Sequence, residues 1–102
     1  MNSKELIERV ERTFSSCLKL MKDKNADYST KVDAFSNFKK IEELGITSVE
    51  KVIMTRVADK LIRITNLLER DNVVNDESVL DSIDDGINYL ALLKTYLSTK
   101  EE

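Results

Sequence analysis

The chain has 102 residues, a length that supports one domain with a single hydrophobic core. Hydrophobic residues make up 41% of it and charged residues 34%, whereas proline is absent and glycine occurs 2 times. Because short strands need turn-forming residues between them, this composition disfavours β-sandwiches and β-barrels. The net charge of −3 argues against a non-specific nucleic-acid binder, which normally carries a basic footprint.

The sequence predicts a protein of the cytoplasm, either of a bacterium or of a phage-infected host cell. No uninterrupted apolar run approaches the ~20 residues of a membrane span, so we expect no membrane partner. The first residues quickly become amphipathic and do not resemble a signal peptide. Cys17 is the single cysteine and cannot form an intrachain disulfide, which fits a reducing compartment.

A first helix is predicted from about Ser3 to Lys24, and Asn2 followed by Glu5 is typical of a capping box at its start. Its apolar residues recur at helical spacing and form one stripe, namely Leu6, Ile7, Val10, Phe14, Cys17, Leu18 and Met21. Cys17 lies within this stripe, and the chain has no histidine that could activate it as a nucleophile. We therefore interpret Cys17 as a small core residue.

The residues from Lys24 to Ser29 break this pattern and predict a loop. A shorter helix is expected from about Lys31 to Leu44, and Gly45 is well placed as its C-terminal stop. The residues expected to face inward are Val32, Phe35, Phe38, Ile41 and Leu44.

Two longer helices complete the prediction. Residues 47–50 (Thr-Ser-Val-Glu) form a capping box that opens a third helix running to about Arg70, a turn follows over residues 71–75, and a fourth helix begins near Asp76. The apolar face expected for the third helix comprises Val49, Val52, Ile53, Val57, Leu61, Ile64, Leu67 and Leu68. That of the fourth comprises Leu80, Ile83, Ile87, Leu90, Ala91 and Leu97. The chain is therefore predicted to be all-α, with residues 1–102 forming one small antiparallel bundle of three long helices and one short helix.

Charged side chains gather on one face of each of the last two helices. The third helix carries Arg56, Asp59, Lys60 and Arg63 at i, i+3, i+4 and i+7. The fourth carries Glu77, Asp81, Asp85 and Asn88. Across an antiparallel pair, the acidic side chains could hold Mg²⁺, while the arginines grip phosphate by their planar forks. The competing interpretation is that these are ordinary solvated helix faces or inter-helix ion pairs.

Several short motifs share their order and spacing with a known family. They are Lys24-Asn25-Ala26-Asp27-Tyr28, then Ala34-Phe35-Ser36-Asn37-Phe38, the run of residues 56–64, and Asn75-Asp76-Glu77-Ser78 with Asp81, Asp85, Asn88 and Tyr89. Over roughly residues 22–96 the chain thus resembles the nucleotide modification associated domain family, short helical proteins of which many come from bacteriophages. That family in turn is similar to the MazG-like all-α nucleoside triphosphate pyrophosphohydrolases.

The resemblance implies a site for a phosphorylated nucleotide. The ligand-binding residues that we carry over are Lys24, Asp27, Tyr28, Asn37, Arg56, Asp59, Lys60, Arg63 and Asn88. Mg²⁺ would be held by Glu77, Asp81 and Asp85, and an enzyme would also use Asp59. Tyr28 or Phe38 could stack on a base, although Phe38 also fits the core. In the chain, Arg56, Lys60 and Arg63 surround a lone Asp59 where the pyrophosphohydrolases carry an acidic helix, which weakens the case for two-metal hydrolysis.

Three functions follow from these patterns. The first is nucleotide binding, in which a phage factor sequesters or presents the nucleotide. The second is a Mg²⁺-dependent nucleoside triphosphate pyrophosphohydrolase of the MazG-like type, and the third is a helical protein-interaction module. Because a small bundle offers few concave surfaces, we also expect a homo-oligomer, with Leu92, Leu93 and Tyr96 as candidates for its contact.

Overall fold

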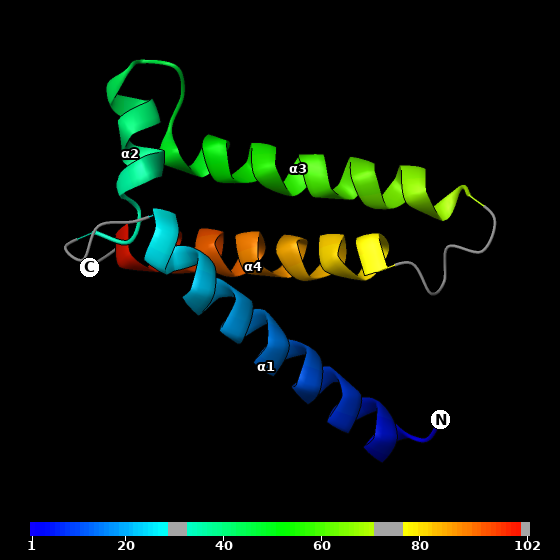
Figure 1. Ribbon diagram of the computed structural model, residues 1–102. Helices are drawn as coiled ribbons and strands as arrows, with labels where there is room; N and C mark the ends of the chain where they lie inside the picture. Colours follow the sequence, from blue (N-terminus) through cyan, green and yellow to red (C-terminus); the bar gives the residue numbers. More distant parts are fainter. Residues whose placement is uncertain (29–32, 71–76, 101–102) are drawn as a thin grey trace.

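The computed structural model describes residues 1–28, 33–70 and 77–100, and for residues 25–28, 77 and 100 it describes only the backbone. Within these ranges the chain forms α1 (Ser3–Tyr28), α2 (Ser36–Glu43), α3 (Val49–Leu68) and α4 (Glu77–Lys100), with no strand (Figure 1). The predicted all-α class, with three long helices and one short helix, is confirmed. None of these helices, as far as they are described, is long and apolar enough to cross a membrane.

The centre of the fold is the pair formed by α3 and α4, which lie antiparallel and side by side over most of their length (Figure 1). The short helix α2 stands across one end of α3. Helix α1 packs on α4 near the C-terminal end of α1 and diverges from it toward the N-terminus. The bundle is therefore closed where all four helices meet and open between the N-terminal halves of α1 and α4.

The ends of the helices follow the local signals in the sequence. The Glu5 backbone N–H donates to Asn2 Oδ1 over 2.9 Å at the start of α1, and the Lys51 N–H donates to Ser48 Oγ over 3.3 Å at the start of α3. Both predicted N-termini are confirmed to within a residue. Gly45 has a φ of 78°, and its N–H donates to the Glu42 carbonyl over 2.9 Å. It thus ends α2 in the left-handed conformation that glycine adopts at low cost.

Two predicted boundaries between the first and second helices are wrong. Helix α1 continues through residues 24–28, which were predicted as a loop, because that stretch lacks apolar spacing but contains no proline or glycine to stop a helix. Helix α2 begins at Ser36 and not near Lys31, because the Asp33 carboxylate accepts the Phe35 N–H over 2.9 Å and fixes a turn there. The predicted turn at residues 71–75, the start at Asp76 and the tail at residues 101–102 lie outside the described residues.

The buried core lies between α3 and α4. It comprises Val49, Val52, Ile53, Val57, Leu67 and Val79, with Cys17 from α1 and the hydroxyl side chain of Ser82 beside it. The apolar face predicted for the third helix is largely confirmed. Leu61 and Leu68 are exceptions, because both are exposed on the outer side of α3.

For α4 the predicted apolar face is mostly wrong, and of its members only Ile87 is half-buried. Leu80, Ile83, Leu90 and Leu97 are exposed, whereas Val79 and Ser82 are buried against α3. The face that meets α3 also carries Gly86, where an added Cβ would lie 3.9 Å from the Lys60 Cβ. Because the buried face carries small and polar residues, the hydrophobic pattern of the sequence favours the neighbouring leucine-rich face instead. Leu92, Leu93 and Tyr96, expected to be exposed, are half-buried.

The apolar stripe of α1 is divided in the same way. Cys17 is buried and Met21 is half-buried where α1 packs on α4. The members that precede Cys17, and Leu18 beside it, are exposed, because α1 has already turned away from α4 there. Only the part of this stripe from Cys17 to Met21 therefore reaches the core of the chain, and within that part Leu18 is exposed.

Candidate functional site

All four helices contribute side chains to one hollow of about 360 Å³, referred to below as the four-helix hollow. Its lining residues are Met21 and Lys24 of α1, Ala34, Asn37 and Phe38 in and before α2, Arg56 of α3, and Asp85, Asn88, Tyr89 and Leu92 of α4. Two cations, one carboxylate and two amides thus meet two aromatic rings and apolar side chains in a single concave surface.

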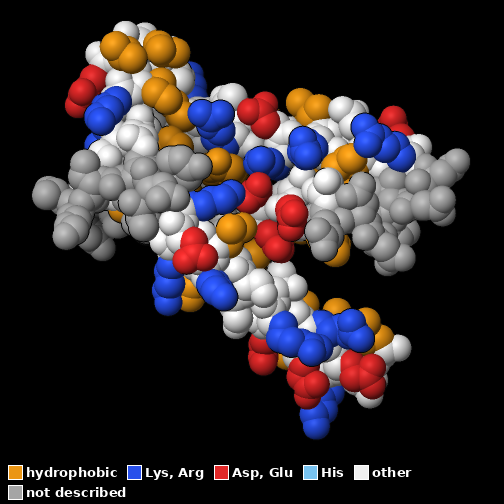
Figure 2. Space-filling view, viewed as in Figure 1, with side chains coloured by type: hydrophobic (Ala, Val, Ile, Leu, Met, Phe, Trp, Pro, Cys, Tyr) orange, Lys and Arg blue, Asp and Glu red, His pale blue; other side chains and the backbone are white. Residues whose placement is uncertain are grey.

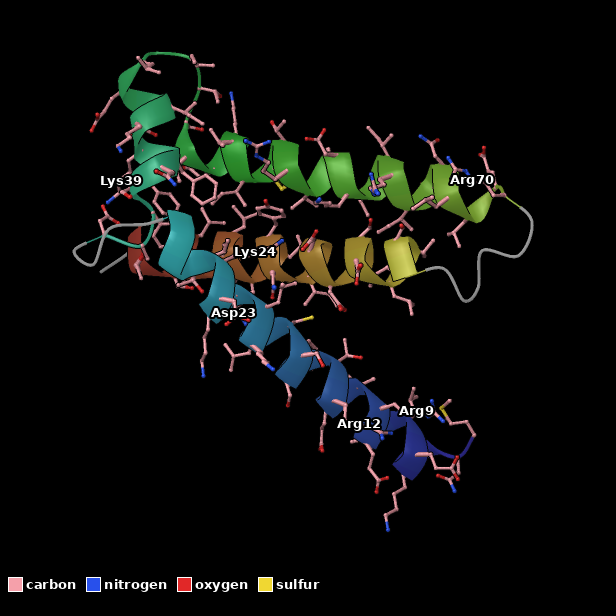
Figure 3. The ribbon with its side chains drawn as sticks, in the orientation of Figure 1. Arg9, Arg12, Asp23, Lys24, Lys39 and Arg70 are labelled. Atoms are coloured by element: carbon pink, nitrogen blue, oxygen red, sulfur yellow. The ribbon has the colours of Figure 1, made fainter. Side chains whose placement is uncertain are left out.

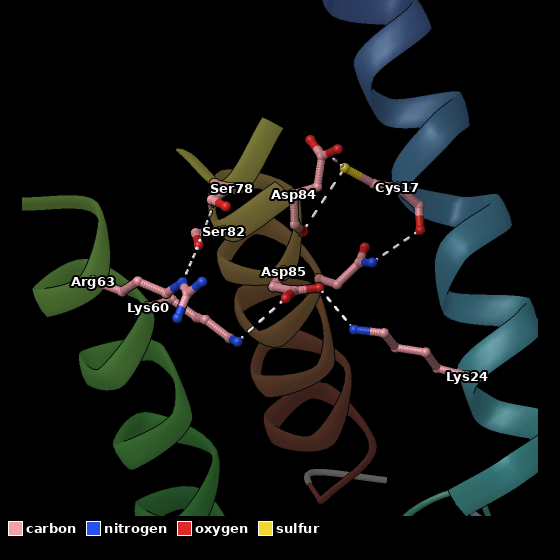
Figure 4. Close-up of polar contacts among 9 residues, drawn as sticks. Cys17, Lys24, Lys60, Arg63, Ser78, Ser82, Asp84 and Asp85 are labelled. Atoms are coloured by element: carbon pink, nitrogen blue, oxygen red, sulfur yellow. Dashed lines mark hydrogen bonds and ion pairs between the residues drawn. The ribbon is translucent and has the colours of Figure 1, made fainter. Parts of the chain in front are cut away.

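Asp85 forms ion pairs that link the helices around this hollow. Its Oδ1 lies 2.8 Å from Lys24 Nζ on α1, and its Oδ2 lies 3.2 Å from Lys60 Nζ on α3, so one carboxylate joins three helices (Figure 4). Partial burial of Asp85 favours its neutral form, but the hydrogen bonds from Lys24 and Lys60 outweigh burial and hold the pKa of this carboxyl below its ordinary value. The side chain is therefore ionised at neutral pH.

Polar groups also attach the middle of α1 to α4. The Asn88 Nδ2 donates to the Cys17 carbonyl over 2.9 Å, and the Cys17 thiol donates to Asp84 Oδ1 over 3.5 Å (Figure 4). Burial, followed by the negative charge of Asp84, raises the pKa of the Cys17 thiol. Because the thiolate is the reactive form, these contacts make Cys17 a poor nucleophile, and its interpretation as a core residue is confirmed.

A second concavity of about 550 Å³, the α3–α4 hollow, lies further along α3. It is lined by Asp59, Lys60, Ile62, Arg63, Asn66, Leu67, Arg70 and Ser78. Arg63 Nε donates to Ser82 Oγ over 3.1 Å, and that hydroxyl donates to the Ser78 carbonyl over 2.7 Å. Arg63 is therefore held against α4 by a buried serine, whereas Arg70 lies just beyond the C-terminal end of α3 (Figure 3).

Helix α2 is held in place by aromatic and ionic contacts. The ring of Phe35 lies 6.4 Å from that of Phe38 and packs edge-on to Tyr96 of α4 at 5.3 Å between centroids. Asp33 and Lys39 form an ion pair of 2.6 Å that closes the turn before α2. These contacts orient the face of α2 that presents Asn37 and Phe38 to the four-helix hollow.

The residues predicted from the sequence are divided between the two hollows. Those in the four-helix hollow are Lys24, Asn37, Arg56, Asp85 and Asn88. Those in the α3–α4 hollow are Asp59, Lys60 and Arg63, although Lys60 also reaches Asp85. Asp81 is exposed on α4 and lines neither hollow as described. The side chains of Asp27, Tyr28 and Glu77 lie outside the described residues.

The described residues contain no group of three histidine, cysteine, aspartate or glutamate side chains placed to hold a metal ion. Asp85 is paired with two lysines, so its oxygens already have cationic partners. Because the side chain of Glu77 is not described, the Mg²⁺ site of Glu77, Asp81 and Asp85 stays a prediction.

Sequence reasoning assigned no site role to Met21, Tyr89 or Leu92, which line the four-helix hollow. Met21 and Tyr89 carry a usable signal, because Met21 precedes Lys24 by three residues and Tyr89 directly follows Asn88. Leu92 looks like any core residue of a helix, and only the packing of α2 against α4 reveals its position.

Comparison with known proteins yields no match from any family model, curated protein or solved structure. The resemblance to the nucleotide modification associated domain family, and the pyrophosphohydrolase relationship behind it, therefore stay predictions.

Proposed function

We propose that the protein binds a phosphorylated nucleotide in the four-helix hollow. The observation that carries this proposal is the convergence of Lys24 and Arg56 with the rings of Phe38 and Tyr89 in one concave surface. A nucleotide has the same two parts, an anionic phosphate and a flat base. The volume of about 360 Å³ is at the small end of the range for ligand pockets, which suits one mononucleotide better than a larger ligand.

The phosphate end of the ligand is assigned to Lys24 and Arg56. The guanidinium of Arg56 can donate two parallel hydrogen bonds to phosphate oxygens, whereas the Lys24 ammonium acts as a point charge. Asp85 holds the Lys24 ammonium at the rim of the hollow through the 2.8 Å ion pair. An incoming phosphate competes with this carboxylate for Lys24, so we expect phosphate affinity to depend on the state of Asp85.

The base end is assigned to the aromatic and apolar side of the hollow. Phe38 is half-buried, and its ring lies 6.4 Å from that of Phe35. Tyr89 lies on α4 one residue after Asn88, and Asn37 brings an amide that can pair with the polar edge of a base. Stacking on such rings tolerates any base, whereas amide hydrogen bonds select among bases.

A thermal-shift screen of nucleoside mono-, di- and triphosphates, with and without Mg²⁺, tests the proposal. A ligand present at ten times its dissociation constant stabilises the folded chain by about 1.4 kcal/mol, which raises the melting temperature by roughly 5–10 °C for a domain of this size. Arg56→Gln should abolish the shift. Arg12→Gln is the matched control, because Arg12 lies on α1 far from the hollow (Figure 3).

The same mixtures separate binding from catalysis. A ligand recovered unchanged supports binding, whereas conversion to monophosphate and pyrophosphate would support the Mg²⁺-dependent hydrolase. If no nucleotide raises the melting temperature of the wild-type protein, both nucleotide functions are wrong and a protein-interaction module is the remaining candidate.

A further inference from the structure

The N-terminal half of α1 exposes a continuous row of large apolar side chains. The exposed fractions are 52% for Leu6, 58% for Ile7, 41% for Val10, 59% for Phe14 and 52% for Leu18. These five residues, named here the α1 stripe, occupy one face because they recur at intervals of three and four. The N-terminal half of α1 projects away from the other helices, so nothing in the described chain covers this face (Figures 1 and 2).

A second exposed apolar surface lies across the opening from the α1 stripe. Leu80 and Ile83, in the first half of α4, are 53% and 38% exposed. They precede Asp84, where α4 touches Cys17 of α1, and the two helices separate beyond that contact. The opening between the N-terminal halves of α1 and α4 is thus apolar on the α1 side, and on the α4 side Leu80 lies near the carboxylates of Asp81 and Asp84. Large apolar patches of this kind mark interaction surfaces.

We propose that a second copy of this chain covers the α1 stripe, through the same stripe, in a two-fold symmetric dimer. A surface that is one helix face can pack on itself, and an isologous contact of this kind closes without leaving an exposed edge. The first turn of the partner's α1 enters the opening beside Leu80 and Ile83. This inference rests on the α1 stripe and does not depend on the nucleotide proposal.

The charges around the stripe favour a second copy over a lipid surface. Between residues 3 and 18 the basic side chains are Lys4, Arg9 and Arg12, and the acidic ones are Glu5, Glu8 and Glu11, so the segment is electrically neutral. Helices that bind membrane surfaces are rich in lysine and arginine on their polar face. A neutral helix gains nothing from anionic lipid and is not repelled by its own copy.

The charge order also indicates an antiparallel arrangement. Lys4 and Glu11 are seven residues apart, or about two turns, and therefore lie on the same edge of the stripe. When two such helices run in opposite directions about a two-fold axis near Ile7 and Glu8, Lys4 of one copy faces Glu11 of the other. In this register residues 3–12 of the two helices overlap, and Phe14 lies beside the N-terminus of the partner's α1. The axis repeats this attraction, so each dimer contains it twice. A parallel pair brings these two side chains together less well.

The size of the surface predicts a reversible dimer. In this register residues 3–12 of the two helices overlap over about 15 Å, and with a face roughly 10 Å wide the footprint is on the order of 150 Å². Leu80 and Ile83 enlarge the contact, but it stays below the ~800 Å² per partner of a standard stable interface. We therefore expect a weak dimer, with a dissociation constant on the order of 100 μM.

Sedimentation velocity of the full chain from about 1 to 300 μM tests the proposal. The wild type should shift from monomer to dimer mass, and Ile7→Asp, at the centre of the contact, should raise the dissociation constant at least tenfold. Lys19→Glu is the matched control, because Lys19 lies on the opposite face of α1 and should leave the dimer unchanged. Far-UV circular dichroism confirms that each variant keeps its helices.

A charge exchange tests the arrangement separately. Lys4→Glu should weaken the dimer several-fold, and adding Glu11→Lys should restore it. A wild type that remains monomeric at every concentration overturns the proposal and leaves the stripe to a different protein. A dimer unaffected by Ile7→Asp shows that another surface forms the contact and equally overturns it. Neither result bears on the nucleotide screen, which is read from ligand-induced melting shifts.

Discussion

Replacing Asp85 by asparagine removes a charge that three helices share and keeps the shape of the side chain. Asp85 is 17% exposed, and its partners Lys24 and Lys60 are 45% and 27% exposed. The more exposed pair with Lys24 should contribute about 0.5 kcal/mol after screening by solvent. The more buried pair with Lys60 should contribute about 1–1.5 kcal/mol as a charge-assisted hydrogen bond. We expect Asp85→Asn to lower the free energy of unfolding by about 1.5–2 kcal/mol at pH 7.

The pH dependence of this difference follows from the lowered pKa of Asp85. A carboxyl whose pKa is lower in the folded state contributes stability that is fully present above its unfolded pKa, about 3.9 for aspartate. This contribution is lost as the pH falls through the folded value. Urea unfolding of the wild type and of Asp85→Asn should therefore give curves that differ at pH 7 and converge as the pH falls below about 4.

Asp81→Asn is the matched control, because Asp81 is an exposed carboxylate one helical turn earlier on α4. It should change the free energy of unfolding by less than about 0.5 kcal/mol at pH 7. If Asp85→Asn lowers the free energy of unfolding no more than Asp81→Asn does, or if its effect is unchanged at low pH, then the ion pairs of Asp85 do not stabilise the packing of the three helices.

Three further predictions concern single positions. Gly86→Ala should raise the free energy of unfolding by up to about 1 kcal/mol in urea titration, because alanine favours the helix and its Cβ would meet the Lys60 Cβ at an ordinary 3.9 Å. A loss of stability would show that α3 and α4 pack more tightly there. Gly45→Ala should lower the free energy of unfolding by about 1–2 kcal/mol, because its φ of 78° is strained for any residue with a Cβ; an unchanged urea midpoint would contradict this. The Cys17 thiol should react with a thiol reagent far more slowly in the native protein than in urea, because it is buried and its pKa is raised. Equal rates would show that α1 does not stay packed on α4.

The local signals in the sequence predicted the helices and most of their ends. Asn2, Gly45 and Ser48 act through hydrogen bonds or backbone angles that involve only residues within a few positions, so their effect is visible in the sequence. The extension of α1 through residues 24–28 is not predicted by apolar spacing, which ends there, although the stretch contains no proline or glycine to stop a helix.

The packing faces could not be predicted in the same way. Counting apolar residues selected the face of α4 with Leu80 and Ile83, yet the face that packs on α3 carries Ser82 and Gly86. Small residues let helices approach, and a buried hydroxyl is acceptable when it has partners, as Ser82 has in Arg63 and the Ser78 carbonyl. An apolar face that is left over can also belong to an interface, which the pattern of one chain does not reveal.

The sequence likewise predicts the candidate site only in part. The charges on the third and fourth helices were predicted to form one seam, and the ion pair of Lys60 with Asp85 does join the two helices. The rest of the seam is divided, because Arg56 and Arg63 are seven residues apart and line different hollows. The contribution of Lys24 depends on the angle at which α1 crosses α4, which only tertiary packing sets.

Helix α1 connects the two proposals. Its described attachment to α4 relies on polar groups, namely the contacts of Cys17 with Asp84 and Asn88 and the pair of Lys24 with Asp85. Such contacts are individually weak, so the position of α1 should respond to anything that binds it. The proposed dimer contact involves the N-terminal half of α1, and a phosphate in the four-helix hollow would bind Lys24 near the C-terminal end of α1. If one event orders α1 for the other, then nucleotide must strengthen the dimer by the same factor by which the dimer strengthens nucleotide binding, because coupling between two binding equilibria is reciprocal.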